Sequence, residues 1–325
     1  MFENLKTHHR WLLEADLRPV QGDRFQPTGF ADLGAARYLA PDGDTWMLLV
    51  ESAQSVANRL EATILAPDGE LDPELAGLSY IQVQLEGASD AKTNSMLEAH
   101  RINSPFIISD KDFQQRFVEM SGYGKNRPLH WPSIARALFR FDVNSLLHGC
   151  FLANLEDGRV RTPRALTGFV EAAGVREAVS GGVKNNPIDP TGTLRATAHD
   201  KDVYGNVPYQ RVEYTATRIT AYFNLDLGLL RGFGLPDPAF ELLVALGLLK
   251  VRRFLDGGLR LRTACDLRLD GPPRVTAPEG GELPDEASLL AATRAAIRGC
   301  AELLGDPPVT ELTTMTKVKG KKDQE

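Results

Sequence analysis

The first 65 residues combine a strand-like and a helix-like hydrophobic pattern. Residues 12–18 alternate between apolar and polar side chains, as in a β-strand with one buried face. A second apolar run at 45–50 leads directly into residues 52–64, where apolar positions recur at helical spacing. The pattern therefore predicts two strands, and a helix that follows the second strand after a tight turn.

The middle of the chain is irregular before a second regular unit appears. Residues 66–135 mix short apolar pieces with Gly, Pro and charged residues, which indicates an insertion. The apolar run at 144–154 predicts a strand, and residues 155–175 predict a helix after it. Arg161 and Arg164 would lie at the turn between them, where a helix N-terminus favours phosphate.

Residues 180–208 contain Gly, Pro, Asn and Asp throughout and few core residues, which is typical of a long projecting arm. Clean alternation at 218–229 predicts a half-buried strand. We expect the next helix to begin with Asp237 as its N-cap and Pro238 in its first turn, and to end in basic residues before Gly257.

The last third of the chain contains a strand with one arginine-rich face. In residues 258–269 the apolar positions face one way, and Arg260, Arg262 and Arg268 face the other. An exposed basic sheet surface is how common single-strand RNA modules present their binding groove. An Ala-rich helix at 285–305 and a basic tail complete the chain.

Composition agrees with a soluble globular protein rather than a disordered or fibrous one. Of the 325 residues, 42% are hydrophobic and 25% are charged. The net charge of -6 is uneven, because residues 1–100 carry -9 and residues 101–325 carry +3. Of the 37 basic residues 26 are Arg, which suits bidentate phosphate contacts and stacking on bases. A local nucleic-acid surface is therefore compatible with the acidic average.

The cysteines and the amino terminus indicate a cytoplasmic protein. Cys150, Cys265 and Cys300 are widely spaced without a Cys/His cluster, which argues against structural zinc and for a reducing compartment. The amino terminus lacks a signal-peptide pattern, and the apolar run at 239–249 is too short to span a membrane. We expect no metal and no cofactor.

Enzymatic signatures are mostly absent, since no Walker A loop, GxSxG elbow or HExxH motif occurs. His148 or His100 could act as a general base in an RNA-cleaving site, although a structural histidine is the simpler interpretation of His148. Asp189, Asp200 and Asp202 could in principle hold a divalent metal, but a solvated loop is the simpler interpretation of these residues.

Four separated blocks resemble a known family. The first block is LLVESAQSVANRLEATI at 48–64, and the second is EAHRINSPFI at 98–107. The third block combines LLHGCFLAN at 146–154 with RTPRALTGFVEA at 161–172, and the fourth is LLKVRRFLDGGLRLRTACDL at 248–267. Together they resemble the type I-G (formerly I-U) CRISPR Cascade backbone subunit, a member of the RAMP superfamily. The resemblance extends from about residue 12 to about residue 300.

The resemblance implies an α+β fold with a ferredoxin-like, RNA-recognition-type palm, inserted fingers and a protruding thumb hairpin. The palm would comprise 10–65, 136–179 and 209–305, with fingers at about 66–135 and the thumb at about 180–208, and 306–325 would form a basic tail. Copies would stack head to tail along the CRISPR RNA and present it for pairing with target DNA. Further partners would be the large subunit and the guide-end-capping subunit of Cascade. The resemblance implies no interaction with a membrane.

The resemblance also implies which residues bind RNA, through phosphates and 2′-hydroxyls rather than by sequence. These residues are Asn58, Arg59, Arg101, Asn103, Ser104, Arg161, Arg164, Lys184, Asn185, Arg260 and Arg262. Val203 or Tyr204 would supply an apolar wedge from the thumb. No residue would be catalytic, because type I systems cut DNA through a separate helicase-nuclease.

Two alternatives remain open at this point. One is a RAMP endoribonuclease that matures the guide RNA by acid-base cleavage with His148 or His100. The other is an unrelated cytoplasmic enzyme whose arginine-rich pocket binds a small anion.

Overall fold

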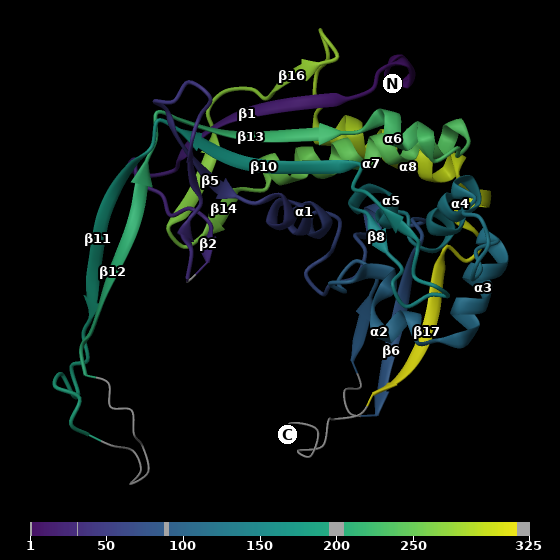
Figure 1. The fold of residues 1–325 in the computed structure, drawn as a ribbon, viewed down its shortest axis with the longest axis horizontal. Helices are drawn as coiled ribbons and strands as arrows, with labels where there is room; N and C mark the ends of the chain where they lie inside the picture. The colour runs from purple at the N-terminus through teal and green to yellow at the C-terminus, as the bar shows by residue number, and fades with distance from the viewer. Residues whose placement is uncertain (1, 31, 88–90, 195–204, 317–325) are drawn as a thin grey trace.

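The protein has the shape of an arch (Figure 1). The computed structural model describes residues 2–30, 32–87, 91–194 and 205–316. A curled antiparallel sheet forms the top of the arch, a two-stranded ribbon forms one leg, and a smaller sheet packed with helices forms the other. Sheets and helices that are segregated in this way confirm the expected α+β class.

In the described part of the chain the main sheet contains eight strands. They are β1 (Trp11–Pro19), β4 (Arg37–Leu39), β5 (Trp46–Glu51), β10 (Leu166–Ala173), β13 (Arg218–Leu225), β14 (Leu259–Arg262), β15 (Cys265–Leu269) and β16 (Arg274–Ala277). Their order is β14-β15-β1-β13-β10-β5-β4, β16 pairs with β1, and every pairing is antiparallel. In β1 the predicted alternation is confirmed, because Leu13, Ala15 and Leu17 are buried.

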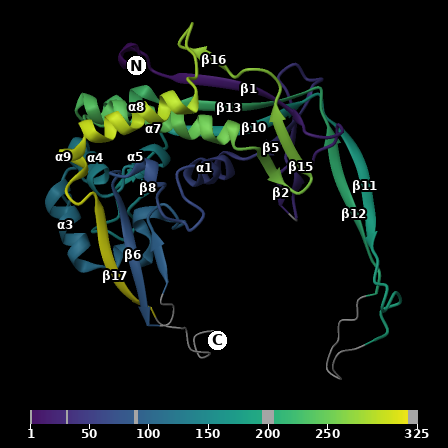
Figure 2. The same ribbon diagram turned by 180° about the vertical axis from the view of Figure 1, so that it is seen from behind.

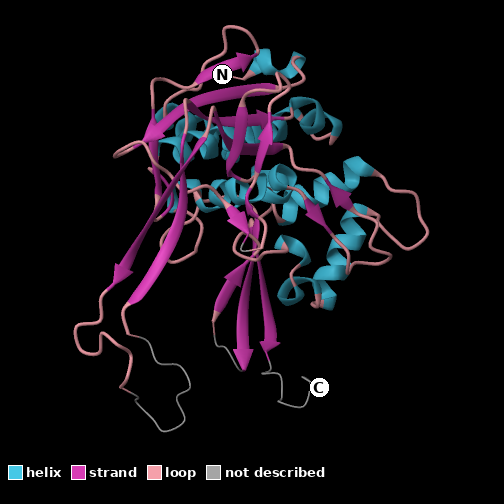
Figure 3. Ribbon diagram, turned by 60° about the vertical axis from the view of Figure 1, so that its left-hand side comes forward, coloured by secondary structure: helices cyan, strands magenta, loops and turns pink. Residues whose placement is uncertain are grey.

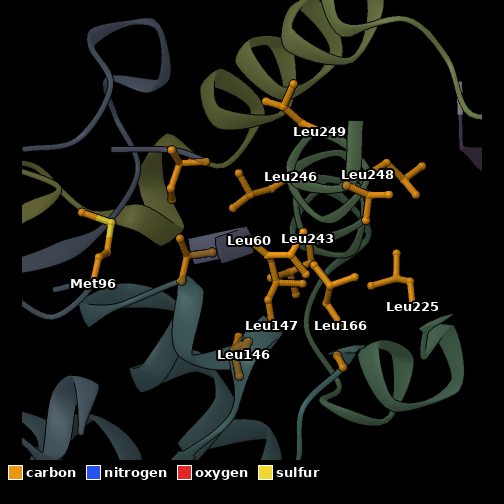
Figure 4. Close-up of a cluster of buried hydrophobic side chains, with 14 of the residues drawn as sticks. Leu60, Met96, Leu146, Leu147, Leu166, Leu225, Leu243, Leu246, Leu248 and Leu249 are labelled. Carbon is orange, nitrogen blue, oxygen red and sulfur yellow. The ribbon is translucent and has the colours of Figure 1, made fainter. Parts of the chain in front are cut away.

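Helices cover one face of this sheet. Helices α1 (Ala53–Ala62), α5 (Asn144–His148) and α7 (Asp237–Asp256) contact the sheet directly. Helices α6 (Leu227–Gly232) and α8 (Glu286–Gly299) pack against α7, and α9 (Ala301–Leu304) contacts α8. Helices α7 and α8 lie behind the sheet in Figure 1 and in front of it in Figure 2. Figure 4 shows the apolar core between sheet and helices, where Leu60, Leu147, Leu166 and Leu243 meet. Among the described residues, no helix combines the length and apolar character needed to cross a membrane.

The second sheet follows the order β17-β6-β7 (Figure 3). It consists of β6 (Tyr80–Gly87), β7 (Lys92–Asn94) and β17 (Val309–Thr316), and near it lie α2 (Pro105–Ile108), α3 (Lys111–Ser121) and α4 (Trp131–Phe141). Strand β17 runs parallel to β6 along its whole length. The prediction of a tail from residue 306 onward is therefore wrong as far as Thr316, because Thr310 and Leu312 are buried in this sheet.

The projecting ribbon is the hairpin of β11 (Arg176–Lys184) and β12 (Val207–Thr215). The two strands pair from Arg176 opposite Thr215 to Lys184 opposite Val207. The arm thus begins before, and ends after, the 180–208 segment identified from composition.

The predicted strand at 144–154 and helix at 155–175 are both wrong. Residues 144–154 form α5 and then the short strand β8 (Cys150–Phe151), and the following residues form β9 (Arg161–Thr162) and β10. In β10 every second residue is buried, and all eight residues pair with β13. This pairing and burial outweigh the helical preference of the segment. Arg161 therefore lies in β9 and Arg164 precedes β10, and neither residue lies at a helix N-terminus.

Smaller corrections concern the last third of the main sheet and its helix. Residues 258–269 form the hairpin β14–β15 rather than one strand. Asp237 is the first residue of α7, whose N-cap is Pro236, and Lys250 is fully buried rather than exposed near the helix end. The remaining short elements are β2 (Gly29–Phe30), β3 (Gly34–Ala35) and the 3-10 helices η1 (Glu3–Thr7), η2 (Pro73–Leu75) and η3 (Arg101–Asn103).

Candidate nucleic-acid interface

An open pocket of about 890 Å³ lies between η3 and the β8–β9 hairpin. Four of the predicted site residues line it, namely Arg101, Asn103, Arg161 and Arg164. His100, His148 and Phe151 also contribute to its walls. Three arginines in one pocket make it the strongest candidate for an anion-binding surface in the described part of the chain.

The β8–β9 hairpin holds Phe151 and Arg161 at the pocket wall. Phe151 lies opposite Arg161, and Cys150 lies opposite Thr162. The Thr162 hydroxyl accepts a hydrogen bond from the Cys150 backbone N–H at 2.9 Å, and both of these side chains point inward and are buried. Because side chains alternate along a strand, Phe151 and Arg161 are exposed, with the guanidinium 5.7 Å from the ring centroid.

Arg164 connects the pocket to α1. It donates a hydrogen bond to Gln54, whose amide in turn donates to Asn58 at 2.7 Å, so the predicted residue Asn58 joins the same surface. Burial, and then the nearby charge of Arg101, lower the pKa of Arg164. Within the described residues neither Arg161 nor Arg164 forms an ion pair, so both positive charges are available to a ligand.

Arg101 is positioned differently, because its charge is already balanced. It donates to both carboxylate oxygens of Glu61, at 2.5 and 2.8 Å, and to the Gly149 carbonyl at 3.3 Å. These bonds tie η3 to α1 and to the start of β8. Arg101 therefore supports the pocket wall more than it offers charge to a ligand.

Asn103 and Ser104 are both buried. The Asn103 side-chain oxygen accepts from the Asn154 backbone N–H at 3.1 Å. Ser104 caps α2, where its hydroxyl accepts from the Phe106 N–H at 3.2 Å and donates to Glu98 at 2.8 Å. Because the Ser104 side chain is inaccessible, the structure does not place it where a ligand could contact it.

Arg59 and Arg262 form a separate cluster around Glu51, which is 1% exposed. Each arginine is ion-paired with one oxygen of this carboxylate. Arg59 also donates to the Leu261 carbonyl, and Arg262 donates to the Gln26 carbonyl at 2.7 Å. The cluster joins α1, β5 and β14 and retains one net positive charge.

The other predicted cations lie elsewhere. Arg260 lines a hollow with Arg24, Glu213 and Asp266, where the charges are mixed. Lys184 and Asn185 are exposed on the projecting arm, and neither lines the large pocket. Val203 and Tyr204, the predicted wedge, lie outside the described residues, as do Asp200 and Asp202.

The open face of the main sheet is acidic at its centre. Glu14, Asp16 and Glu171 alternate with buried residues and so face away from the helices. Phe169 and Tyr222 stack between them, with ring centroids 5.1 Å apart. Arg274 forms an ion pair with Glu14, so Asp16 and Glu171 supply most of the negative charge at this centre, which disfavours phosphate. Arg260 and Arg268, the exposed arginines of the predicted stripe, lie at the β14–β15 edge of the sheet.

A buried polar cluster lies behind the pocket. Lys250 donates to Asn144 at 2.7 Å and approaches the Nε2 atom of His148 at 2.8 Å. Burial lowers the pKa of Lys250 to about 7, against the opposing effects of Glu61 and Asp142. Burial and the charge of Lys250 hold the pKa of His148 well below its usual range. His148 is therefore neutral near pH 7 and is held by structural contacts.

Phe151 and Gln54 are interface residues that the sequence did not reveal. Phe151 lies in an apolar run that predicts a core strand, and Gln54 lies in a helix without any special motif. No group of three or more His, Cys, Asp or Glu side chains suited to a metal ion occurs among the residues that the structure describes.

Comparisons with known proteins found two similar solved structures and one matching family. No curated protein matches the chain. One similar solved structure is described as "CRISPR RNA-guided surveillance complex, pre-nicking"; it is 14% identical, with 90% of this chain and 85% of that chain covered and a TM-score of 0.43. Another is Csc2 of Thermofilum pendens, 9% identical, with 93% and 78% covered and a TM-score of 0.31. The family described as CRISPR-associated protein GSU0053 matches residues 11–177, just over half of the chain. The chain therefore belongs to the family of CRISPR-associated protein GSU0053.

Proposed function

We propose that this protein is an RNA-binding backbone subunit of a type I CRISPR Cascade complex, of subtype I-G. The observation that carries the proposal is the pocket in which Arg161 and Arg164 present positive charge that no described acid pairs with, beside the polar face of α1. Arginine binds phosphate without reading the base sequence, as a subunit that holds guides of any sequence requires.

The strand order of the main sheet supports a ferredoxin-like, RNA-recognition-type palm. Its four central strands follow the spatial order β15-β1-β13-β10. In the chain, α1 lies between β1 and β10, and α7 lies between β13 and β15, which is a β-α-β-β-α-β succession. The second sheet with α2 and α3 would correspond to the fingers, and the β11–β12 arm would correspond to the thumb.

In this proposal copies of the chain polymerise head to tail along the CRISPR RNA and present it to the target DNA strand. A repeated heterologous contact of this kind generates a helical filament, whose length the RNA would limit. The large subunit and the guide-end-capping subunit of Cascade would complete the assembly, and no cofactor is required.

We also propose that the subunit is not catalytic. A general base must exchange a proton with its substrate, and it works best with a pKa near the working pH. His148 is 1% exposed and its pKa lies well below that range, which disfavours it as the base of an endoribonuclease.

The test is sedimentation of the protein with single-stranded RNAs of increasing length, at low and at high salt. We expect the number of bound copies to rise stepwise with RNA length and the affinity to fall with salt. The double substitution Arg161→Gln/Arg164→Gln should weaken binding to unrelated sequences equally and reduce the salt slope by about 2, one for each lost phosphate contact. Arg294→Gln/Arg298→Gln, on an exposed side of α8, is the matched control and should bind as the wild type does.

A small oligomer that is indifferent to RNA would refute the scaffold proposal and would favour an enzyme that binds a small anion. Stepwise binding that survives the double substitution would retain the scaffold and exclude this pocket as its RNA-binding surface. Cleaved RNA in EDTA that persists in a His148→Ala variant but is lost in His100→Ala would identify an endoribonuclease with His100 as its base.

A further inference from the structure

Phe151 is an exposed aromatic side chain in a pocket that three arginines also line. Nearly half of its surface, 49%, is accessible, although its strand neighbours Cys150 and Leu152 are buried. Exposure of a large aromatic ring is unfavourable in water, and such rings on a pocket wall commonly contact ligands. Packing in the protein core therefore does not explain why an aromatic side chain occupies this position.

The hairpin that carries Phe151 is held firmly in place. Gly149 has a φ of 76°, and a Cβ atom there would lie 2.8 Å from the Thr162 carbonyl oxygen. The strands are further joined by the hydrogen bond between Cys150 and Thr162, and Arg101 anchors the Gly149 carbonyl. The ring is thus presented by a supported element and not by a loose loop tip.

The surroundings of Phe151 match one kind of ligand. Arg161 lies over the ring, and Arg164 lines the same pocket without an ionic partner among the described side chains. A nucleotide combines a flat aromatic base with a negative phosphate, so it would satisfy the ring and the arginines together. A double-stranded segment would not, because its bases are already stacked on each other.

We propose that Phe151 and Arg161 form a stacking platform for one unpaired base of the bound RNA. This inference rests on the proposed function and adds to it a defined subsite and a mode of binding. Every base has an aromatic face, so the platform accepts any sequence. The Phe151 ring holds the base without ionic contact, and the guanidinium groups of Arg161 and Arg164 hold the phosphate.

Base stacking and phosphate contacts contribute to RNA affinity with a different dependence on salt. Loss of a phosphate contact reduces the number of counterions released on binding, whereas loss of stacking leaves that number unchanged. Phe151→Ala should weaken RNA binding roughly 5- to 100-fold with an unchanged salt slope. Phe151→Trp should restore most of the affinity, and Phe151→Leu, which keeps the apolar volume without the ring, should not.

The decisive experiment uses the full-length protein and the shortest RNA that binds one copy. A set of such RNAs carries a single abasic site at each position in turn, and the affinity of each is measured for the wild type and for Phe151→Ala. The wild type should lose affinity at one position of the RNA, and the variant should be insensitive to the abasic site at that position. Trp46→Ala is the matched control, because Trp46 is 45% exposed with Arg37 5.5 Å from its ring, but it does not line the pocket.

Three outcomes would be distinguishable. Wild-type protein that fails to bind RNA at all would overturn the proposed function itself. Binding that depends on Arg161 and Arg164 but responds identically to abasic sites in the wild type and in Phe151→Ala would overturn the platform alone. An equal loss of affinity in Trp46→Ala would also overturn it, since the effect would not be specific to this pocket.

Discussion

Lys250 offers a test of the buried polar cluster through the pH dependence of stability. Its side chain is fully buried, and its pKa is about 7 in the folded protein against an ordinary value of 10.5. The difference corresponds to roughly 5 kcal/mol of unfavourable free energy when the folded protein must carry the charged form. We expect Lys250→Met to reveal this contribution.

The direction follows from proton binding. Between pH 7 and about 10.5 the unfolded chain keeps the Lys250 proton and the folded protein releases it, so stability rises with pH. The unfavourable contribution is complete below the folded pKa of about 7 and disappears as pH rises through the unfolded value of 10.5. From about pH 7.5 to about pH 9.5 the wild type should gain roughly 2–3 kcal/mol relative to Lys250→Met.

The assay is urea unfolding at several pH values, followed by tryptophan fluorescence and by circular dichroism. Tyrosines and cysteines also titrate in alkaline solution, but they are common to both proteins and cancel in the difference. Lys111→Met removes an exposed lysine and should follow the wild type at every pH. Wild-type and Lys250→Met stabilities that change in parallel with pH would refute the reasoning, since the folded pKa of Lys250 would then be unperturbed.

Two further substitutions test the supports of the interface. Glu51→Gln removes the buried carboxylate that holds two arginines, so we expect the free energy of unfolding, measured with heat or urea, to fall by about 2–4 kcal/mol. The control Glu177→Gln removes a carboxylate from an exposed ion pair and should change the free energy of unfolding by less than about 1 kcal/mol. Equal effects of the two substitutions would contradict the burial of Glu51. Gly149→Ala places a Cβ atom at a positive φ and against the Thr162 carbonyl, so it should lower both stability and RNA affinity. The control Gly122→Ala also has a positive φ but open space around the new Cβ atom, so it should lower the free energy of unfolding by only about 1–2 kcal/mol and leave RNA affinity unchanged. RNA affinity unchanged in Gly149→Ala would show that the hairpin position does not matter for binding.

Local patterns in the sequence determined much of the main sheet and its helices. The alternation in β1 and the helical spacing in α1 were interpreted correctly, and Asp285 caps α8 at the end expected of that helix. These elements bury one face, so the period of their apolar residues records which face is buried. The α+β class was expected from the family resemblance, and these elements agree with it.

Other elements depended on partners distant in sequence. Strand β17 forms because β6, more than 200 residues earlier, offers an edge for parallel pairing. Strand β10 is a strand because β13 pairs with all eight of its residues, although its composition also suits a helix. A short segment carries no record of such partners, so its own pattern is ambiguous.

The same distinction applies to the interface. The sequence indicated its arginines, but their pairing is a property of the tertiary structure. Glu61 and Glu51 neutralise much of the charge on Arg101, Arg59 and Arg262, whereas no described acid reaches Arg161 or Arg164. The charge that a side chain offers a ligand depends on its neighbours in space, and folding brings those neighbours together from distant parts of the chain.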